Sequence, residues 1–231
     1  MAAASAESPA RAGNDGAGRP RRSGLVQERS RQTRQRLVRA ALELWTARGF
    51  EDGIETTTVE EIVQAAGVTK GTFYFHFAHK EDILLEIGWG TSEAMIKEAN
   101  GALARGLPLE AALDELLTAA ARRVSATPRV VVARTLEEFH RRRRNGEPPG
   151  LGEHGGYQAA YALVLGQARE RGEIPPDVDV DDLAEILQSL TMGALQRWVA
   201  DEHADLLALM RYRAAVMLAG VREVTGATRA I

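Results

Sequence analysis

The chain has 231 residues, no cysteine and a formal net charge of −3 at pH 7. That length suffices for one large domain or two small ones with a buried core. The absence of cysteine excludes disulfides and thiolate metal sites and suits a reducing compartment. No apolar run approaches the ~18 residues of a membrane-spanning helix. We therefore expect a soluble, cytoplasmic protein without membrane contact.

The charge is unevenly distributed along the chain. Residues 1–48 carry ten arginines against four acidic residues, a net charge of +6, so the remainder carries −9. The first 24 residues lack an apolar segment, which predicts a disordered basic tail over residues 1–24 rather than a secretory signal. Arginines in such a tail can neutralise phosphates. A solvated tail that only aids solubility is the open alternative.

The first predicted helix runs from about Gln27 or Ser30 to Arg48. Its apolar side chains recur at helical spacing and form one stripe. They are Leu37, Val38, Ala41, Leu42 and Trp45. Gly49 ends this helix, and we expect residues 49–58 to form a loop that leads to the next one.

Residues 57–66 predict a short helix with a doubled start signal. Thr57 with Glu60 and Thr58 with Glu61 both fit a capping box, so which threonine caps the helix stays open. The apolar positions that follow recur at i, i+3, i+4 and i+7, and they must pack on a core. They are Val59, Ile62, Val63 and Ala66.

A second short helix follows after a tight turn. Gly67 stops the first helix, and Thr69 fits the N-cap of the second. Phe73 and Phe77, at i and i+4, point together into the core. Two short helices joined in this way form a helix-turn-helix, a DNA-reading unit. The core shared with the first predicted helix comprises Trp45, Phe50, Ile62, Val68, Phe73 and Phe77.

These residues resemble a known family. GF followed by TTVEEIVQAAGV and TKGTFYFHFAHKEDIL is similar to the N-terminal domain of TetR-family transcriptional regulators, over roughly residues 30–85. The resemblance implies an all-α protein, with a three-helix DNA-binding domain over 25–78 and a helical effector-binding and dimerisation domain over 79–225. The loop from Glu51 to Thr56 is longer than usual for the family. It leaves open which of Thr57 and Thr58 contacts the DNA backbone.

The resemblance also implies a set of DNA contacts. The start of the second short helix enters the major groove, where Lys70 and Thr72 can bond base edges and Gly71 lets the backbone approach closely. Tyr74 is expected to donate to a phosphate, and Lys80 to anchor another beside a helix N-terminus. For each contact, the alternative is an ordinary surface residue. The full set is Thr57, Thr58, Thr69, Lys70, Gly71, Thr72, Tyr74, Phe75, His76 and Lys80.

The rest of the chain predicts further helices. One runs from near His79 toward Ala104, with weak points at its glycines, and Pro108 opens the next, which ends near Ser125. Thr127 and Pro128 fit the N-cap and first turn of another. That helix ends in four arginines at 141–144, which we interpret as a solvated end that complements the helix dipole rather than as a nucleic-acid site. Residues 145–156 predict a flexible loop.

Two apolar stripes near the C-terminus predict a pair of helices that associates with a second copy as a four-helix bundle. In the family these last helices form the homodimer, whose twofold pair of reading heads recognises a palindrome. The alternative is that both stripes are buried within one chain. The expected interface residues are Leu187, Leu190, Ala194, Trp198, Met210, Ala214 and Met217.

The family further implies a small-molecule effector in a pocket among the middle helices. Effector binding would favour a dimer whose reading heads are wrongly spaced for the operator. Aromatic residues at helical spacing are otherwise ordinary core. The candidate lining residues are Trp89, Phe139, His140, Tyr157, Tyr161 and Met192.

We therefore expect a homodimeric, sequence-specific DNA-binding regulator, a repressor that a small molecule releases from its palindromic operator. A TetR-like activator is the alternative, and an all-α DNA-packing protein is less favoured because the chain after residue 48 is acidic. We find no nucleophile elbow, phosphate-binding glycine loop or zinc pattern, so we expect no enzyme, no cofactor and no metal. The operator sequence, the effector and the regulated genes are not determined.

Overall fold

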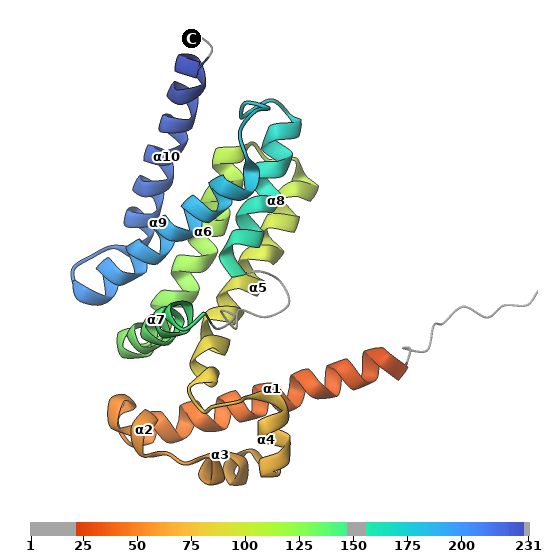
Figure 1. Ribbon diagram of the computed structural model, residues 1–231, viewed down its shortest axis with the longest axis vertical. Helices are drawn as coiled ribbons and strands as arrows, with labels where there is room; N and C mark the ends of the chain where they lie inside the picture. The colour runs from red at the N-terminus through yellow and green to blue at the C-terminus, as the bar shows by residue number, and fades with distance from the viewer. Residues whose placement is uncertain (1–21, 147–155, 229–231) are drawn as a thin grey trace, which may run out of the picture.

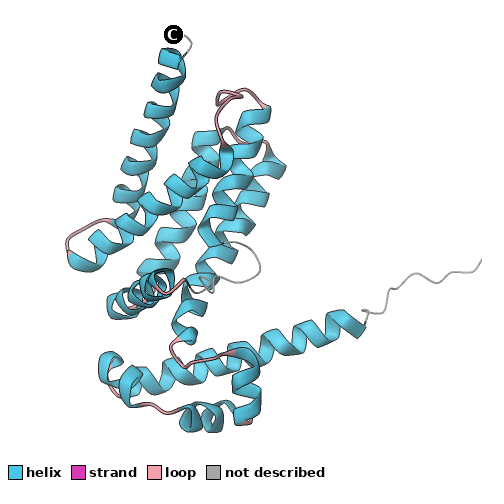
Figure 2. Ribbon diagram, in the orientation of Figure 1, coloured by secondary structure: helices cyan, strands magenta, loops and turns pink. Residues whose placement is uncertain are grey.

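The computed structural model describes residues 22–146 and 156–228, and within these ranges every regular element is a helix (Figures 1 and 2). The chain forms two parts, a small N-terminal domain below and a larger helical domain above it in Figure 1. Among the described residues, no helix has both the length and the apolarity needed to cross a bilayer. The helices are α1 Arg22–Ala47, α2 Phe50–Thr56, α3 Val59–Ala66, α4 Lys70–His76, α5 Asp82–Arg105, α6 Leu109–Ser125, α7 Arg129–Arg144, α8 Gly156–Glu170, α9 Val180–Ala200 and α10 Leu206–Thr228.

The N-terminal domain is built on α1, which lies across α2, α3 and α4 (Figure 1). Trp45, Ile62 and Phe73 are fully buried at its centre, and Phe77 is 2% exposed. Phe50 packs edge-on against Trp45, with ring centroids 6.1 Å apart. The predicted shared core is therefore confirmed, with Phe50 and Val68 partly buried at its border.

Two predictions for this domain were wrong. The segment after Gly49 is not a loop, because α2 occupies residues 50–56 and makes this a four-helix domain. Gly53 explains the close packing of α2, since any Cβ there would collide with the Trp45 backbone. The first helix also begins at Arg22, earlier than Gln27. Of the predicted disordered tail over residues 1–24, residues 22–24 belong to α1, and residues 1–21 lie outside the described part of the chain.

The C-terminal domain packs α5, α6, α8 and α9 around one large core. Met95, Leu116, Tyr161 and Leu165 are fully buried there, and Leu187 is 1% exposed. α9 and α10 form a helical hairpin on one side of the domain (Figure 1). α7 closes the lower end of the domain, next to the N-terminal domain, and contacts α5, α9 and α2.

The helix boundaries of this domain follow the sequence signals with two corrections. α5 begins at Asp82 rather than near His79, and it continues unbroken through Gly88 and Gly90. The N-cap of α7 is Pro128, not Thr127, whose hydroxyl donates instead to the Arg123 carbonyl at 3.3 Å. Of the predicted loop over 145–156, residues 147–155 lie outside the described part of the chain.

Candidate nucleic-acid interface and interior cavity

The start of α3 resolves which threonine caps the helix. The Thr58 hydroxyl accepts from the Glu61 amide at 3.3 Å, and the Glu61 carboxylate accepts from the Thr58 amide at 2.8 Å. Thr57 is fully buried, and its hydroxyl oxygen accepts from Arg48 at 3.1 Å. The predicted DNA contact at Thr57 is therefore wrong, because no ligand reaches a buried side chain. Thr58 is exposed at the surface.

α4 begins with a hydroxyl cap. The Thr69 hydroxyl accepts from the Thr72 amide at 3.2 Å, and the two threonine hydroxyls lie 2.9 Å apart. Lys70 is more than half exposed and forms an ion pair with Glu60 of α3. The first turn of α4 thus presents short polar side chains and one cation. Such groups can read base edges.

The two faces of α4 differ sharply. Phe73 and Phe77 are buried, whereas Tyr74 is 57% and Phe75 80% exposed. His76 is half-buried, and burial, with the nearby Arg34 charge, lowers its pKa. His76 is therefore neutral near pH 7 and offers a neutral ring rather than a cation. Exposed neighbouring aromatic residues on a short helix indicate a contact surface.

Gly71 lies in the first turn of α4, where neither the backbone conformation nor the packing within the protein requires a glycine. Its φ is not positive, and a Cβ added there would meet only the Thr69 hydroxyl, at 3.8 Å. The fold would therefore accept a side chain at this position. A close approach from outside the molecule is the remaining physical reason for a glycine.

Lys80 is not the freely exposed phosphate anchor that the sequence predicted. Its ammonium group donates to the carbonyl of Glu55 at 2.8 Å and to that of Thr57 at 2.9 Å. These carbonyls end α2, where a cation is favourable to the helix dipole. Lys80 therefore ties the loop after α4 to α2, and two of its three hydrogens are occupied.

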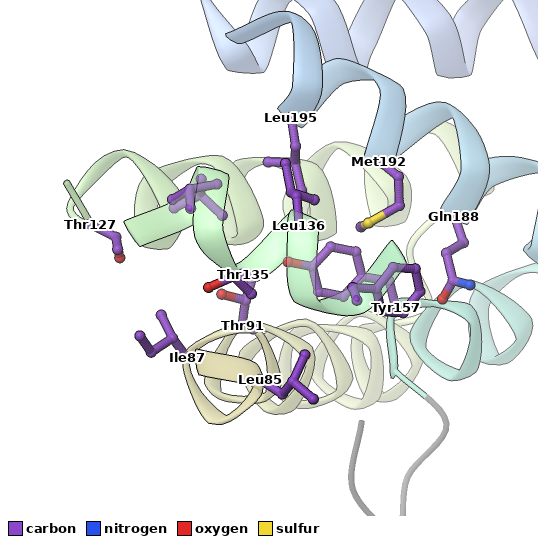
Figure 3. A pocket seen from close by; sticks show the side chains of 14 residues that line it. Leu85, Ile87, Thr91, Thr127, Thr135, Leu136, Tyr157, Gln188, Met192 and Leu195 are labelled. Atoms are coloured by element: carbon purple, nitrogen blue, oxygen red, sulfur yellow. The ribbon is translucent and has the colours of Figure 1, made fainter. Parts of the chain in front are cut away.

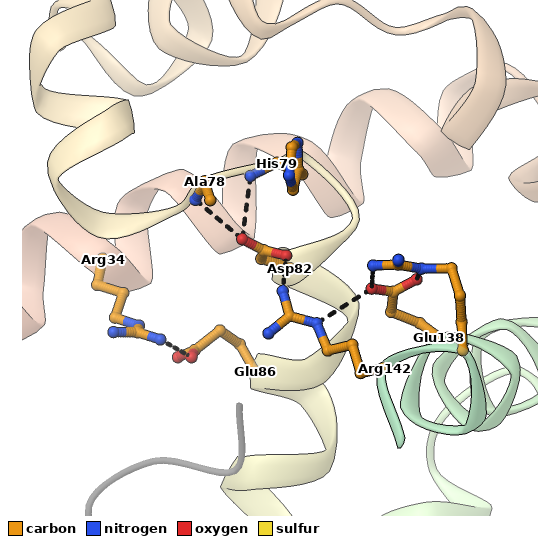
Figure 4. Close-up of polar contacts among 8 residues, drawn as sticks. Arg34, Ala78, His79, Asp82, Glu86, Glu138 and Arg142 are labelled. Atoms are coloured by element: carbon orange, nitrogen blue, oxygen red, sulfur yellow. Dashed lines mark hydrogen bonds and ion pairs between the residues drawn. The ribbon is translucent and has the colours of Figure 1, made fainter. Parts of the chain in front are cut away.

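An ionic network joins α7 to the segment between α4 and α5 (Figure 4). Asp82 accepts from the amides of Ala78 and His79 at 2.9 and 3.0 Å, and its other oxygen pairs with Arg142. Arg142 also donates to Glu138 at 3.2 Å. The side chains of Arg142 and Asp82 are each 12% exposed. The interpretation of residues 141–144 as a solvated helix end is therefore wrong for Arg142.

A second link joins α1 to α5. Arg34 pairs with Glu86 (Figure 4), and its guanidinium lies 5.0 Å from the Phe77 ring centroid and 4.9 Å from that of Trp89. Burial raises the pKa of Glu86 despite this partner. The N-terminal domain is thus held to α5 by one clamped arginine and to α7 by Asp82.

A cavity lies inside the C-terminal domain, among α5, α6, α7, α8 and α9 (Figure 3). The space open to the centre of a water-sized sphere is about 60 Å³, room for a few waters. The Tyr157 hydroxyl points toward Thr91 and Thr135, and burial raises the pKa of Tyr157 to about 12. The wall consists of Leu85, Ile87, Gly88, Thr91, Val124, Thr127, Val132, Thr135, Leu136, Phe139, Tyr157, Gln188, Met192 and Leu195.

Only half of the predicted effector residues line this cavity. Phe139, Tyr157 and Met192 do so. Trp89 instead lines a groove between α1 and α5. His140 and Tyr161 do not line the cavity, so their prediction as effector contacts was wrong. The His140 ring forms a hydrogen bond with the Gln196 side chain at 2.7 Å. Tyr161 is fully buried, and its hydroxyl forms a hydrogen bond with that of Thr191. Thr91, Thr135 and Gln188 were missed, because single polar residues on amphipathic helices give no sequence signal.

Most of the predicted interface residues point into the chain itself. Five are at most 7% exposed, so their selection as dimer contacts was wrong: Leu187, Ala194, Trp198, Met210 and Ala214. Leu190 and Met217 are partly exposed. Among the described side chains of α9 and α10, the large apolar ones that are exposed are Ile186 at 45%, Tyr212 at 70% and Val216 at 54%. The apolar residues at regular helical spacing in α9 and α10 thus pack in the core. Residues next to them in the sequence face solvent.

Residues 37–87 match the family model described as bacterial regulatory proteins of the tetR family. TcmR of Streptomyces glaucescens, an HTH-type transcriptional regulator, is 47% identical over 66 residues, which cover 29% of this chain and 27% of TcmR. ArpR of Pseudomonas putida, a probable HTH-type regulator, is 26% identical over 79% of this chain and 88% of its own length. The match to TcmR thus spans about a quarter of that relative.

Solved structures give the same result over a longer span. Thermus thermophilus FadR, a TetR-family repressor solved in complex with lauroyl-CoA, superposes with a TM-score of 0.65 and 26% identity over 80% of this chain and 93% of its own. A helix-turn-helix with an exposed second helix, joined to a helical domain, is an arrangement typical of DNA-binding regulators. Over residues 37–87 the chain matches the TetR family model, and over 80% of its length it is similar to a solved TetR-family repressor.

Proposed function

We propose that the protein is a homodimeric, sequence-specific DNA-binding repressor that leaves its operator when a small molecule enters the cavity. The exposed face of α4 carries this proposal. Tyr74 and Phe75 are 57% and 80% exposed beside the open backbone at Gly71. A fold that needed no outside contact would have no reason to present two aromatic rings next to a glycine.

The side chains on and around α4 fall into those that can contact bases, those that can contact phosphates, and one that holds α4 in place. Thr72 and Lys70 occupy the first turn, where they can reach base edges once Lys70 exchanges Glu60 for DNA. Tyr74 can donate to a phosphate oxygen of the DNA. The N-terminus of α3, capped by Thr58, can offer further amide groups to the DNA backbone. Lys80 acts by positioning, because it holds the loop after α4 against α2.

Dimerisation is supported by the outer face of α9 and α10. Ile186, Tyr212 and Val216 are all at least 45% exposed. Burial of these three side chains against a second copy would remove exposed apolar surface from water. A twofold pair of α4 helices about one DNA turn apart, ~34–36 Å, would read a palindrome.

The network around Arg142 supports a route from the cavity to α4. One face of α7 carries cavity residues such as Leu136 and Phe139, and the same helix carries Glu138 and Arg142, which hold Asp82. Because the cavity is narrow, an occupant larger than a few waters has to push a wall helix outward. Displacement of α7 would pull on Asp82 and hence on the loop that follows α4.

The test is a fluorescence-anisotropy titration of the full chain with DNA from upstream of its own gene, at physiological salt. The matched control is the same fragment with its sequence scrambled. We expect the upstream fragment to bind at least about a thousandfold more tightly, the lower range for specific recognition. Equal affinity for both fragments, repeated with DNA selected from the whole genome, would refute sequence-specific regulation.

A further inference from the structure

A surface groove lies directly beside the cavity, between α1 and the α5–α6 pair. Ile87 and Thr127 line both the groove and the cavity. One layer of side chains therefore separates the apolar interior from solvent at this point. A ligand that displaced these two side chains would lie partly inside the domain and partly between the two domains.

The cavity and the groove differ in charge. No Asp, Glu, Lys or Arg side chain lines the cavity, so an ionised group inside it would be unpaired, which is costly. The groove is lined by four arginines and three glutamates. Arg34 is committed to Glu86. Among the described residues, no ion pair or side-chain hydrogen bond engages Arg31, Arg39 or Arg123, and only Glu43 and Glu93 oppose them.

Arg123 stands at the boundary between the two spaces. Its guanidinium lies over Gly90, and a Cβ at that position would come within 2.5 Å of the Arg123 Nη2. The charge of Arg123 also counteracts part of the burial effect on the pKa of Tyr157, whose side chain lines the cavity. Glycine at position 90 thus lets an unpaired cation lie against α5 at the mouth of an apolar chamber.

We propose that the effector is an amphipathic anion, with an apolar body in the cavity and a carboxylate or phosphate head bound by Arg123 in the groove. The inference rests on the proposed function only in taking this cavity as the effector site. The combination of an uncharged chamber and an unpaired cation at its mouth selects this ligand class, since each part of such a molecule meets a matching surface. The head group would also lie against α1, so one ligand would contact both domains.

The experiment compares probes that share one chain and differ in the head group. The full chain is titrated by calorimetry with dodecanoate, dodecyl phosphate, lauroyl-CoA, dodecanol and dodecylammonium, below the concentration at which each aggregates. Trp89 in the groove provides a second readout by fluorescence. The variants are Arg123→Gln, the charge-retaining Arg123→Lys, and the control Arg122→Gln, which changes an exposed arginine that lines neither space.

We expect an anionic probe to bind about tenfold or more tightly than dodecanol, and dodecylammonium to bind weakest, because one charge-assisted hydrogen bond is at stake. Arg123→Gln should remove that preference without changing dodecanol binding, whereas Arg123→Lys and Arg122→Gln should retain it. The stronger anion, carboxylate or phosphate, identifies the head group. Equal binding of the alcohol and the anions, binding of no probe, or equal effects of the two glutamine variants would overturn the inference.

DNA binding by the same preparations separates this inference from the proposed function. A wild-type protein that prefers its upstream DNA but shows no anion preference overturns the ligand class alone. A protein that prefers the anions but binds all DNA equally overturns the regulatory function alone. The control Arg122→Gln should bind DNA like the wild type, since Arg122 lies on α6, away from α4, and lines neither the cavity nor the groove.

Discussion

Replacing Gly71 by Ala should stabilise the protein and weaken DNA binding at the same time. The added methyl group meets only the Thr69 hydroxyl at 3.8 Å, and the backbone at Gly71 is already helical. Alanine is favoured over glycine in a helix by up to about 1 kcal/mol, because glycine loses more backbone freedom on folding. For a chain of this size the melting temperature should rise by about 1–4 °C.

The DNA affinity of the same variant should fall by a factor of about 5 to 150. If the α4 backbone approaches the bases at Gly71, the methyl group overpacks a tight contact, at a cost of about 1–3 kcal/mol. The opposite signs matter, because a variant that is merely damaged would lose both stability and binding. Thermal unfolding monitored by circular dichroism gives the first quantity, and anisotropy with upstream DNA gives the second.

Gly101→Ala is the matched control for this prediction. Gly101 lies within α5, also in a helical conformation, and a Cβ added there meets nothing within 4 Å. It should raise the melting temperature to a similar degree and leave DNA affinity unchanged. If Gly71→Ala binds DNA as tightly as the wild type, the backbone at Gly71 does not approach DNA closely, and the assigned role of α4's first turn is wrong.

Three further predictions concern other parts of the molecule. Arg142→Gln should lower the free energy of unfolding in urea by about 3 kcal/mol, because it leaves the largely buried carboxylate of Asp82 without its cationic partner, whereas Glu138 keeps Arg141; a loss below ~1 kcal/mol would contradict a buried network. Arg48 and the Thr58 amide lower the pKa of Glu61 from 4.5 to about 2, so its contribution is present above pH 4.5 and lost as the pH falls toward 2; Glu61→Gln should flatten the stability profile across that window. Val216→Glu should convert a dimer into monomers in light scattering, and an unchanged mass would exclude this face as the interface.

The helix starts, helix ends and buried faces of the N-terminal domain could be predicted from the sequence, because they depend on residues close together in the chain. The capping box and the αL glycine at Gly67 act within four residues, and the i, i+4 pair of Phe73 and Phe77 fixes one face of α4. Even here the sequence left two capping threonines open. The choice of Thr58 depends on Arg48, which engages Thr57 from nine positions upstream.

The errors in the C-terminal domain share one cause. The spacing of Leu187, Ala194 and Trp198 shows that these residues share a helix face, but it does not show which neighbour covers that face. Arg142 likewise carries the signal of an exposed helix end, yet Asp82, sixty positions earlier, makes it a buried partner. The polar residues of the cavity come from different helices, so no local pattern joins them.

The sequence by itself determined the all-helical composition, the helix-turn-helix and the outward position of Tyr74 and Phe75, because periodicity and caps are set by bonds and contacts within a few residues. Tertiary structure alone decided that residues 50–56 form a helix, that Lys80 caps α2, and which side of the α9–α10 hairpin faces solvent. Those outcomes depend on contacts between segments far apart in the chain. Helix packing, rather than helix propensity, selects among them.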